Sequence, residues 1–197
     1  MTTLRLPNVT LVAVTGKDKE LHEKVLDKAS ESINFGDVKL VWETNIQSID
    51  DWNYFIVYRL HHWIKTDFAL LIHPDGYPTR PDLWRDEWLE LDFIGSPWPL
   101  PLDDYSYRDV YGNIQRVGNS VSLRSKRLLE FPDRTHMVWQ SYYGNTNEDG
   151  FICVHNRHLF EKAGMKFATF EQALHFGKEA PLPENEGLET FLFHHYG

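Results

Sequence analysis

Cysteine is almost absent from this chain, and long hydrophobic runs are missing from it. Its 197 residues include one cysteine, Cys153, so an internal disulfide is excluded and a reducing compartment is expected. No apolar stretch approaches the roughly 18 residues that a membrane span requires. The first residues also lack a charged segment followed by a long apolar one, so no secretory signal peptide is expected. These absences predict a cytoplasmic protein without a membrane span.

Positive charge is scarce as well. The chain has 20 Lys and Arg against 29 Asp and Glu, a formal net charge of −9, which weighs against general nucleic-acid binding. A metal-bridged anionic ligand stays compatible with this charge, because the cation supplies the positive charge itself. The 42% hydrophobic and 25% charged fractions are typical of globular proteins. They predict a single domain over residues 1–197, which could also be one part of a longer protein.

Three familiar catalytic signatures are missing too. No GxGxxG sequence follows the first predicted strand, which weighs against a dinucleotide-binding Rossmann domain. The GxxxxGK[ST] sequence of P-loop proteins is absent as well, so no P-loop is predicted. The GxSxG sequence of serine hydrolases is absent, and Cys153 falls in the middle of a predicted helix. Neither a serine nor a cysteine nucleophile is therefore predicted.

What the sequence does contain is an alternation of buried strands with amphipathic helices. This order predicts an α/β fold, with a mostly parallel, Rossmann-like sheet flanked by helices. Strands are predicted at residues 9–14, 38–42, 68–72, 92–97, 117–124 and 165–168. Helices are predicted at 17–32, 52–63, 81–88, 125–131 (closed by Pro132) and 148–163 (capped by Gly164), with long loops at 98–116 and 135–147.

The segment TDFALLIHPDGYP, residues 66–78, predicts the functional edge of that sheet. Its apolar run is typical of a strand buried on both faces, and it stops at HPDG, where proline and glycine require a turn. His73 and Asp75 thus follow the carboxyl end of a strand, where open α/β sheets bind ligands. We predict a site for a divalent metal and a diphosphate, with Asp75 as an oxygen ligand. The alternatives are an Asx-turn role for Asp75 and a plain strand-end role for His73.

Further polar residues stand at predicted strand and helix ends. Asn119 follows Gly118 at a strand start, where small residues let a ligand approach the backbone, although turn chemistry explains both residues equally well. Glu148 and Asp149 open a predicted helix, so Asp149 is either a general base or an acid that complements the helix dipole.

The remaining candidates are an arginine in a predicted helix and two histidines near the C-terminus. Arg59 is the odd charge on the apolar stripe of its helix, and it either reaches a diphosphate or snorkels to the surface. His194 and His195 lie in a C-terminal segment whose phenylalanines, Phe191 and Phe193, indicate that the tail is docked.

Six segments, in this order, resemble a family of small GT-A-type glycosyltransferase-like domains from bacteria and viruses. The chain also resembles a capsid-modifying glycosyltransferase domain of a large algal virus. If this chain is viral as well, its expected location is the cytoplasm of the host cell. Together the segments cover most of the chain from Leu6 to Gly197. They are LPNVTLVAV, TDFALLIHPDGYPTRPDLW, DFIGSPWP, VGNSVSLRSKRLLE, NEDGFICV and TFLFHHYG.

The resemblance implies a sugar-nucleotide site. HPDG stands where the family has an acidic DxD-type metal motif, with Asp75 as its surviving carboxylate and His73 in place of an acid. Val14, Thr15 and Gly16, which end the first strand, would line the nucleotide pocket. The implied cofactor is a divalent metal, Mn²⁺ or Mg²⁺, and the implied donor is a nucleoside-diphosphate sugar, with a UDP-sugar favoured.

The remaining family positions concern the sugar and the acceptor. GNSVSLRS, which begins with Gly118 and Asn119, falls where the family has a glycine-rich strand under the donor sugar. Asp149 matches the base of inverting members, and His194 matches the C-terminal histidine that completes the metal site. The implied acceptor is a hydroxyl of a glycan or glycoprotein.

A metal-dependent, inverting glycosyltransferase is therefore the predicted function. A metal-dependent hydrolase of phosphorylated or nucleotide-sugar substrates, using His73, Asp75 and His194, is one alternative, but it should need more acidic ligands. A non-catalytic glycan-binding domain is the other, suggested by seven Trp, nine Tyr and twelve Phe.

Overall fold

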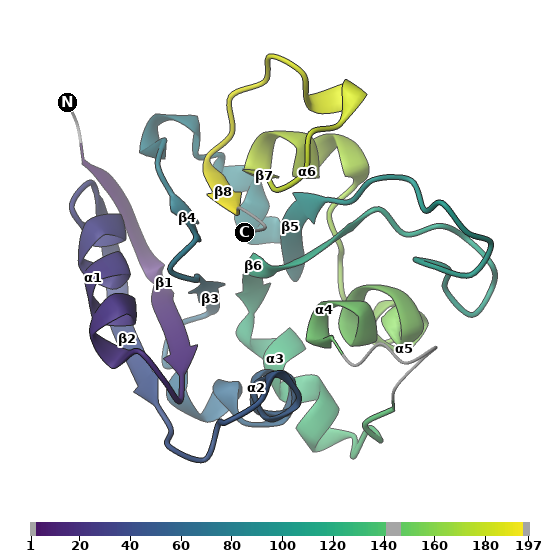
Figure 1. Ribbon diagram of the computed structural model, residues 1–197, viewed down its shortest axis with the longest axis horizontal. Helices are drawn as coiled ribbons and strands as arrows, with labels where there is room; N and C mark the ends of the chain where they lie inside the picture. Colours follow the sequence, from purple (N-terminus) through teal and green to yellow (C-terminus); the bar gives the residue numbers. More distant parts are fainter. Residues whose placement is uncertain (1–2, 141–146, 195–197) are drawn as a thin grey trace.

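A five-stranded sheet forms the centre of the computed structural model, which describes residues 3–140 and 147–194 (Figure 1). Its strand order is β2-β1-β3-β6-β5. β1 pairs in parallel with β2 and β3, whereas β6 runs antiparallel to β3 and to β5. Only β6 is reversed, which confirms the predicted α/β fold with a mostly parallel sheet. The strands are β1 (Leu4–Thr15), β2 (Ile33–Trp42), β3 (Phe68–Leu71), β5 (Phe93–Pro97) and β6 (Val117–Ser125).

Helices pack on both faces of this sheet, because apolar side chains point alternately to either side of its buried strands. Leu11 of β1 lies in a cluster with side chains of α1 and α6, whereas the adjacent Val12 lies in a cluster with those of α2 and α3. A third cluster joins α5 and the segment after α4 to the β5 end. The helices are α1 (Lys19–Ser30), α2 (Ile49–Tyr58), α3 (Lys126–Arg134), α4 (Glu148–Gly150), α5 (Arg157–Lys162) and α6 (Phe170–Phe176).

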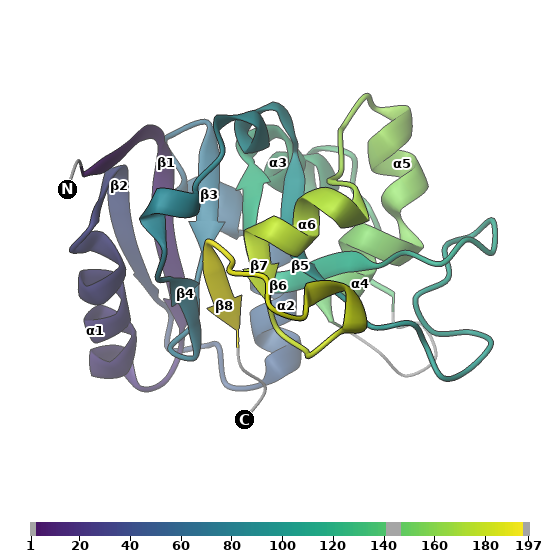
Figure 2. The same cartoon turned by 90° about the horizontal axis from the view of Figure 1, so that it is seen from above.

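A second sheet of three short strands lies beside the first (Figure 2). It consists of β4 (Gly76–Pro78), β7 (Gly177–Lys178) and β8 (Leu192–His194). β8 is the middle strand, antiparallel to β4 and parallel to β7. The sequence did not predict this sheet, but it did predict the docked C-terminal segment, and Phe191 is fully buried. His195 lies outside the described residues.

Several predicted helices differ from the structure. The helix predicted to close at Pro132 continues to Arg134, because Pro132 falls in its last turn and Met137 N–H donates to the Pro132 carbonyl. The helix predicted at residues 148–163 is divided into α4, a wide π-type turn (Phe151–His155) and α5. Asn156 causes this division, since its backbone N–H and side-chain Nδ2 both donate to the Phe151 carbonyl, at 3.1 and 3.0 Å.

The peripheral segments depart from the predictions in smaller ways. The strand predicted at residues 165–168 is reduced to a single bridge between Phe93 and Phe167, and the helix predicted at 81–88 forms two short 3₁₀ turns. The segment 98–116 is the predicted long loop and extends away from the sheets in both ribbon views (Figures 1 and 2). Within residues 3–140 and 147–194, no helix combines the length and the apolar character needed to cross a bilayer.

Candidate functional site

A pocket of about 300 Å³ opens at the carboxyl end of β1. Its lining includes Val14, Thr15 and Gly16, the predicted nucleotide-pocket residues, together with Trp52 from α2 and His73 from the end of β3. Trp52 is fixed there because its indole Nε1 donates to the Val14 carbonyl at 3.0 Å. The structure thus brings the ends of two neighbouring parallel strands to one concave site, as the sheet topology predicts.

Gly16, which lines this pocket, lets two backbone segments approach each other closely. A Cβ atom at residue 16 would lie 1.8 Å from the Ile46 carbonyl oxygen, which is backbone and cannot rotate away. Glycine is therefore required at this position for steric reasons.

We expect Gly16→Ala to lower the free energy of unfolding by about 1–3 kcal/mol, the range for overpacking. Urea denaturation measures this loss. Gly150→Ala is the matched control, because the nearest atom to its added Cβ would be 4.0 Å away. Equal stability of the two variants would contradict the close approach at Gly16.

His73 occupies the turn that follows β3. The His73 and Gly76 backbones bond to each other in both directions, at 2.9 and 3.1 Å, so Pro74 and Asp75 form the tip of a tight turn. The His73 ring lies 5.1 Å from that of Trp52 and stacks at 5.6 Å on that of His194. Burial, with the nearby His194 ring, lowers the pKa of His73 to about 3, so its imidazole is neutral at pH 7. Its Nε2 is buried and, among the described residues, has no hydrogen-bond partner.

The small sheet brings two carboxylates to His194. Gly76 pairs with His194 across β4 and β8, and Lys178 pairs with Phe193 across β7 and β8, so Asp75 and Glu179 flank the histidine. Asp75 Oδ1 lies 3.6 Å from His194 Nε2, and Glu179 Oε1 lies 3.6 Å from His194 Nδ1. The predicted metal residues Asp75 and His194 are thus neighbours, and Glu179 is an acidic residue that the sequence did not single out.

The Asp75–His194 pair fits a divalent cation. Two ligand atoms of one ion, each about 2.0–2.3 Å from it, lie roughly 3–3.6 Å apart. The 3.6 Å separation of Asp75 Oδ1 and His194 Nε2 is therefore compatible with one shared ion. The exposed carboxylate offers the oxygen ligand that Mn²⁺ and Mg²⁺ take, and the imidazole adds a nitrogen ligand that is more typical of the later transition metals.

Asp149, the predicted base, lies beside the start of β6. Its Oδ2 accepts from the backbone N–H of Asn119 at 3.2 Å, and its Oδ1 accepts from Gly150 N–H at 2.7 Å. Asn119 adopts φ of 86°, a left-handed conformation in which its own Oδ1 accepts from Val121 N–H. Burial and the adjacent Glu148 charge raise the pKa of Asp149 to about 7. Asn119, predicted to lie under the donor sugar, and Asp149, predicted as the base, are therefore neighbours in the structure.

Glu148 has a structural role, because it forms a buried ion pair with Arg124. Its Oε1 accepts from Arg124 Nη2 at 2.6 Å, and both side chains are almost completely buried. Arg124 also donates from Nε to Ser122 Oγ at 2.8 Å and lies over the ring of Phe93. This pair ties α4 to β6 and so positions Asp149.

Tyr107 and Glu179 lie electrostatically between Asp149 and the Asp75–His194 pair. Burial raises the pKa of Tyr107, and the charges of Glu179 and Asp149 raise it further. Glu179 also raises the pKa of Asp149. Asp149 therefore shares one electrostatic environment with the carboxylate that contacts His194. Tyr107 adopts φ of 56° and stacks on Trp98, whose ring packs against Gly118.

Residues 37–191 match a protein family described as "Protein of unknown function (DUF5672)". The chain belongs to this family. Among solved structures, this DUF5672 chain is similar to a glycosyltransferase involved in the glycosylation of the major capsid of PBCV-1, at 10% identity and a TM-score of 0.60. The match covers 94% of this chain and 91% of that one, which confirms a glycosyltransferase-like fold. No curated protein matches the chain.

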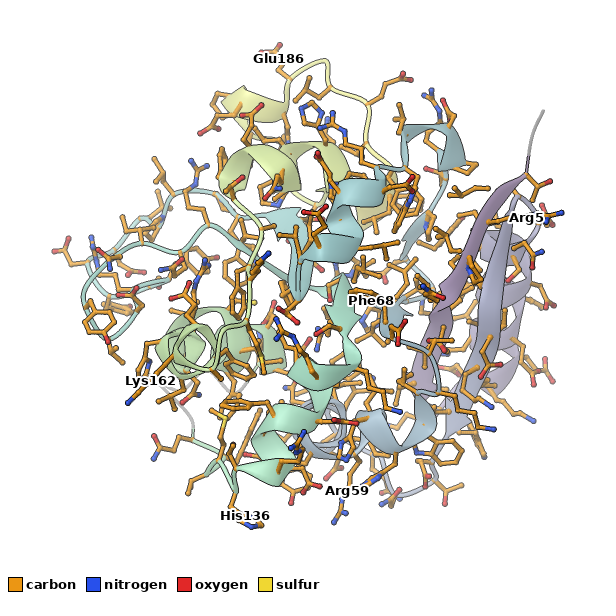
Figure 3. All side chains as sticks on the ribbon, turned by 180° about the vertical axis from the view of Figure 1, so that it is seen from behind. Arg5, Arg59, Phe68, His136, Lys162 and Glu186 are labelled. Carbon is orange, nitrogen blue, oxygen red and sulfur yellow. The ribbon has the colours of Figure 1, made fainter. Side chains whose placement is uncertain are left out.

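One predicted site residue of this DUF5672 chain lies apart from the others. Arg59 is exposed and caps the carboxyl end of α2, seven residues beyond Trp52. Seven residues correspond to about 10 Å along a helix, so Arg59 lies away from the pocket that Trp52 lines. Figure 3 labels it at the edge of the molecule. The alternative prediction, a side chain that extends to the surface, describes its position.

Proposed function

We propose that this chain is a metal-dependent glycosyltransferase, which transfers a sugar from a nucleoside diphosphate to an acceptor hydroxyl with inversion. The main support is one edge of the sheet that carries a 300 Å³ pocket, an acid–imidazole pair and a carboxyl group with a pKa near 7. The glycosyltransferase-like fold is consistent with this assignment. A UDP-sugar is the favoured donor, and a glycan or glycoprotein is the proposed acceptor.

The donor nucleotide is assigned to the pocket at the end of β1. Val14, Thr15 and Gly16 line this pocket, and Trp52 adds an aromatic side chain to its lining. The diphosphate would extend from there toward Asp75 and His194, which would hold the cation. A bound Mn²⁺ or Mg²⁺ supplies positive charge that stabilises the departing nucleoside diphosphate.

Asp149 is assigned as the general base. A base works best when its pKa lies near the working pH, and a pKa of about 7 leaves about half of the Asp149 carboxyl groups ionised at neutral pH. The ionised carboxylate takes the proton of the acceptor hydroxyl, whose oxygen attacks the anomeric carbon from the face opposite the diphosphate. Asn119 and Gly150 N–H groups hold the carboxylate oxygens in place.

Removal of the Asp75 carboxylate tests the metal assignment. We expect UDP to raise the melting temperature of the wild type more with Mn²⁺ than without it, and Asp75→Asn to abolish this metal-dependent increment. A thermal-shift titration measures both. Asp27→Asn, at an exposed position on α1, is the matched control and should behave like the wild type. An unchanged metal-dependent increment in Asp75→Asn would refute the role of Asp75.

A metal-dependent hydrolase is the second candidate, and Glu179 is the observation that favours it. Glu179 adds a second carboxylate beside His194 and so partly meets the need for acidic ligands. The hydrolase would use water in place of an acceptor, so it would release the free sugar and UDP from a UDP-sugar at full rate without an acceptor. The transferase requires an acceptor for a comparable rate, so the rate of UDP release with and without acceptor distinguishes them. Sugar binding that ignores nucleotide and metal would instead support a glycan-binding domain.

A further inference from the structure

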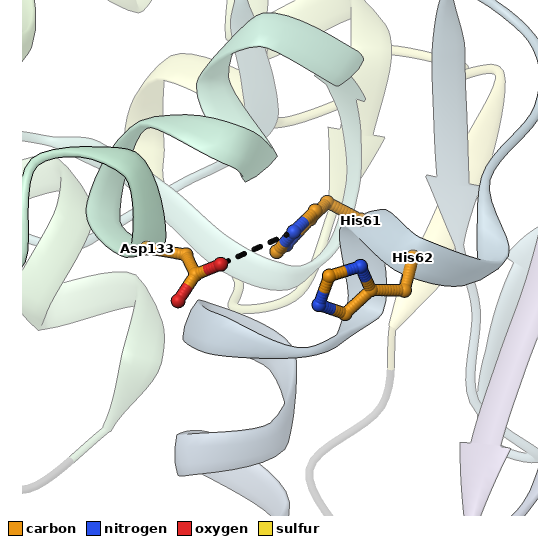
Figure 4. Close-up of side chains that lie close together, drawn as sticks. All are labelled: His61, His62 and Asp133. Atoms are coloured by element: carbon orange, nitrogen blue, oxygen red, sulfur yellow. Dashed lines mark ion pairs between the residues drawn. The ribbon is translucent and has the colours of Figure 1, made fainter.

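Two histidines and an aspartate form a compact group at the carboxyl end of α2 (Figure 4). His61 and His62 belong to the 3₁₀ turn Leu60–Trp63, and Asp133 belongs to α3. One ligand atom from each residue lies within 4.8 Å of the other two. His61 Nε2 is 3.5 Å from Asp133 Oδ2, and the two imidazole rings are 3.9 Å apart. Like Arg59, this group lies at the end of α2 opposite the pocket.

The burial of this group is uneven in a way that suits a ligand site. The His61 side chain is only 10% exposed, and within the described part of the chain its Nδ1 has no hydrogen-bond partner. His62 is exposed and Asp133 is partly exposed, so an ion can reach the group from solvent.

The types of donor atom indicate which ion would bind. Two imidazoles with one carboxylate are a common ligand set for Zn²⁺, and a water molecule usually fills the fourth position. Mg²⁺ and Ca²⁺ prefer oxygen ligands and are poorly served by two nitrogens. Ligands of one zinc ion lie closer together than 4.8 Å, but the exposed His62 side chain can rotate inward at little cost.

We propose that His61, His62 and Asp133 bind a divalent transition-metal ion, with Zn²⁺ as the representative ion. The ion would link the turn after α2 to α3, two elements that otherwise meet through apolar side chains and the His61–Asp133 contact. This site is independent of the proposed sugar-nucleotide site and does not depend on the proposed activity. Its expected role is to hold these two elements together, because metal that binds only the folded chain stabilises it.

Calorimetric titration of Zn²⁺ into tag-free protein tests the proposal. The titrations use the Asp75→Asn background, so that the acid–imidazole pair at the sheet edge contributes less. We expect one zinc ion per chain, with His62→Ala and Asp133→Asn each weakening binding at least roughly tenfold, since even partners of ligands matter that much. Both residues are accessible, so these variants should fold. Zn²⁺ should also raise the melting temperature, and Mg²⁺ should not.

His175→Ala is the matched control. His175 also lies near a carboxylate, 3.7 Å from Glu171 Oε1, but that pair has no third ligand within the described residues. Its loss should leave zinc affinity unchanged. The proposal is overturned if zinc binds equally well to all three variants, if His175→Ala weakens it as much as His62→Ala, or if the unaltered background protein binds no zinc.

Discussion

Asp149→Asn is expected to lower the rate of sugar transfer by roughly 10²- to 10⁴-fold, the usual contribution of a general base. The amide cannot take the acceptor proton, although its oxygen can still accept one backbone hydrogen bond. Donor and metal affinity should change little, because Asp149 lies beside Asn119 and not in the nucleotide pocket. Initial rates of UDP release with an acceptor measure the loss, and a calorimetric titration of UDP measures donor affinity.

The pH dependence provides the control for this assignment. Because the base must be ionised, the transfer rate of the wild type should rise as pH increases through about 7. The folded state raises the pKa of Asp149 from 3.8, so between about 4 and 7 the folded chain holds a proton that the unfolded chain releases. Asp149 therefore reduces stability progressively across that window. Asp149→Asn should therefore be more stable than the wild type at pH 8. If Asp149→Asn keeps the wild-type transfer rate, Asp149 is not the general base.

Arg124→Met is expected to lower the free energy of unfolding by about 3–5 kcal/mol, the cost of leaving a buried charge without its partner. Glu148 is 3% exposed and would lose the Arg124 guanidinium, which lies 2.6 Å away. Asn53 Oδ1 accepts from the backbone N–H of Glu148 and does not replace a partner of its carboxylate. The apolar replacement fills most of the space, so the loss is mainly electrostatic. Urea denaturation followed by tryptophan fluorescence measures it.

Two variants make this result specific to the buried pair. Arg134→Met removes an arginine that is 73% exposed and 3.6 Å from Glu130, and it should cost less than about 1 kcal/mol. Arg124→Met combined with Glu148→Met removes both charges and should recover part of the lost stability, as apolar replacements of buried pairs often do. If Arg124→Met costs no more than Arg134→Met, the pair does not hold α4 against β6.

The sequence predicted the sheet edge because its signals are local. The apolar run before His73 and the β-branched run ending at Thr15 are strong patterns, and both strands lie where the order of elements places them. Asp75, Asp149 and His194 were predicted partly from position along the chain and partly from family resemblance. The structure places the first beside the third and brings the second to β6.

Glu179 and the small sheet could not be predicted in the same way. β7 has two residues and β8 three, too few for a periodic pattern, and their pairing joins distant parts of the chain. The position of Arg59 depended on where α2 ends, which is among the least certain features of a helix. α2 stops at Tyr58, so Arg59 becomes its cap and does not belong to the buried stripe.

β8 docks between β4 and β7, so its contacts at the proposed site can open without unfolding of the central sheet. β8 joins the rest of the molecule through strands of two and three residues, whereas the five-stranded sheet contains the long strands β1, β2 and β6. Local opening free energies follow such differences in pairing and burial. Release of β8 would carry His194 away from Asp75 and Glu179 while the central sheet stays closed. The closure of the proposed metal site and the folding of the central sheet are therefore two equilibria in this chain, and the first is the less costly to disturb.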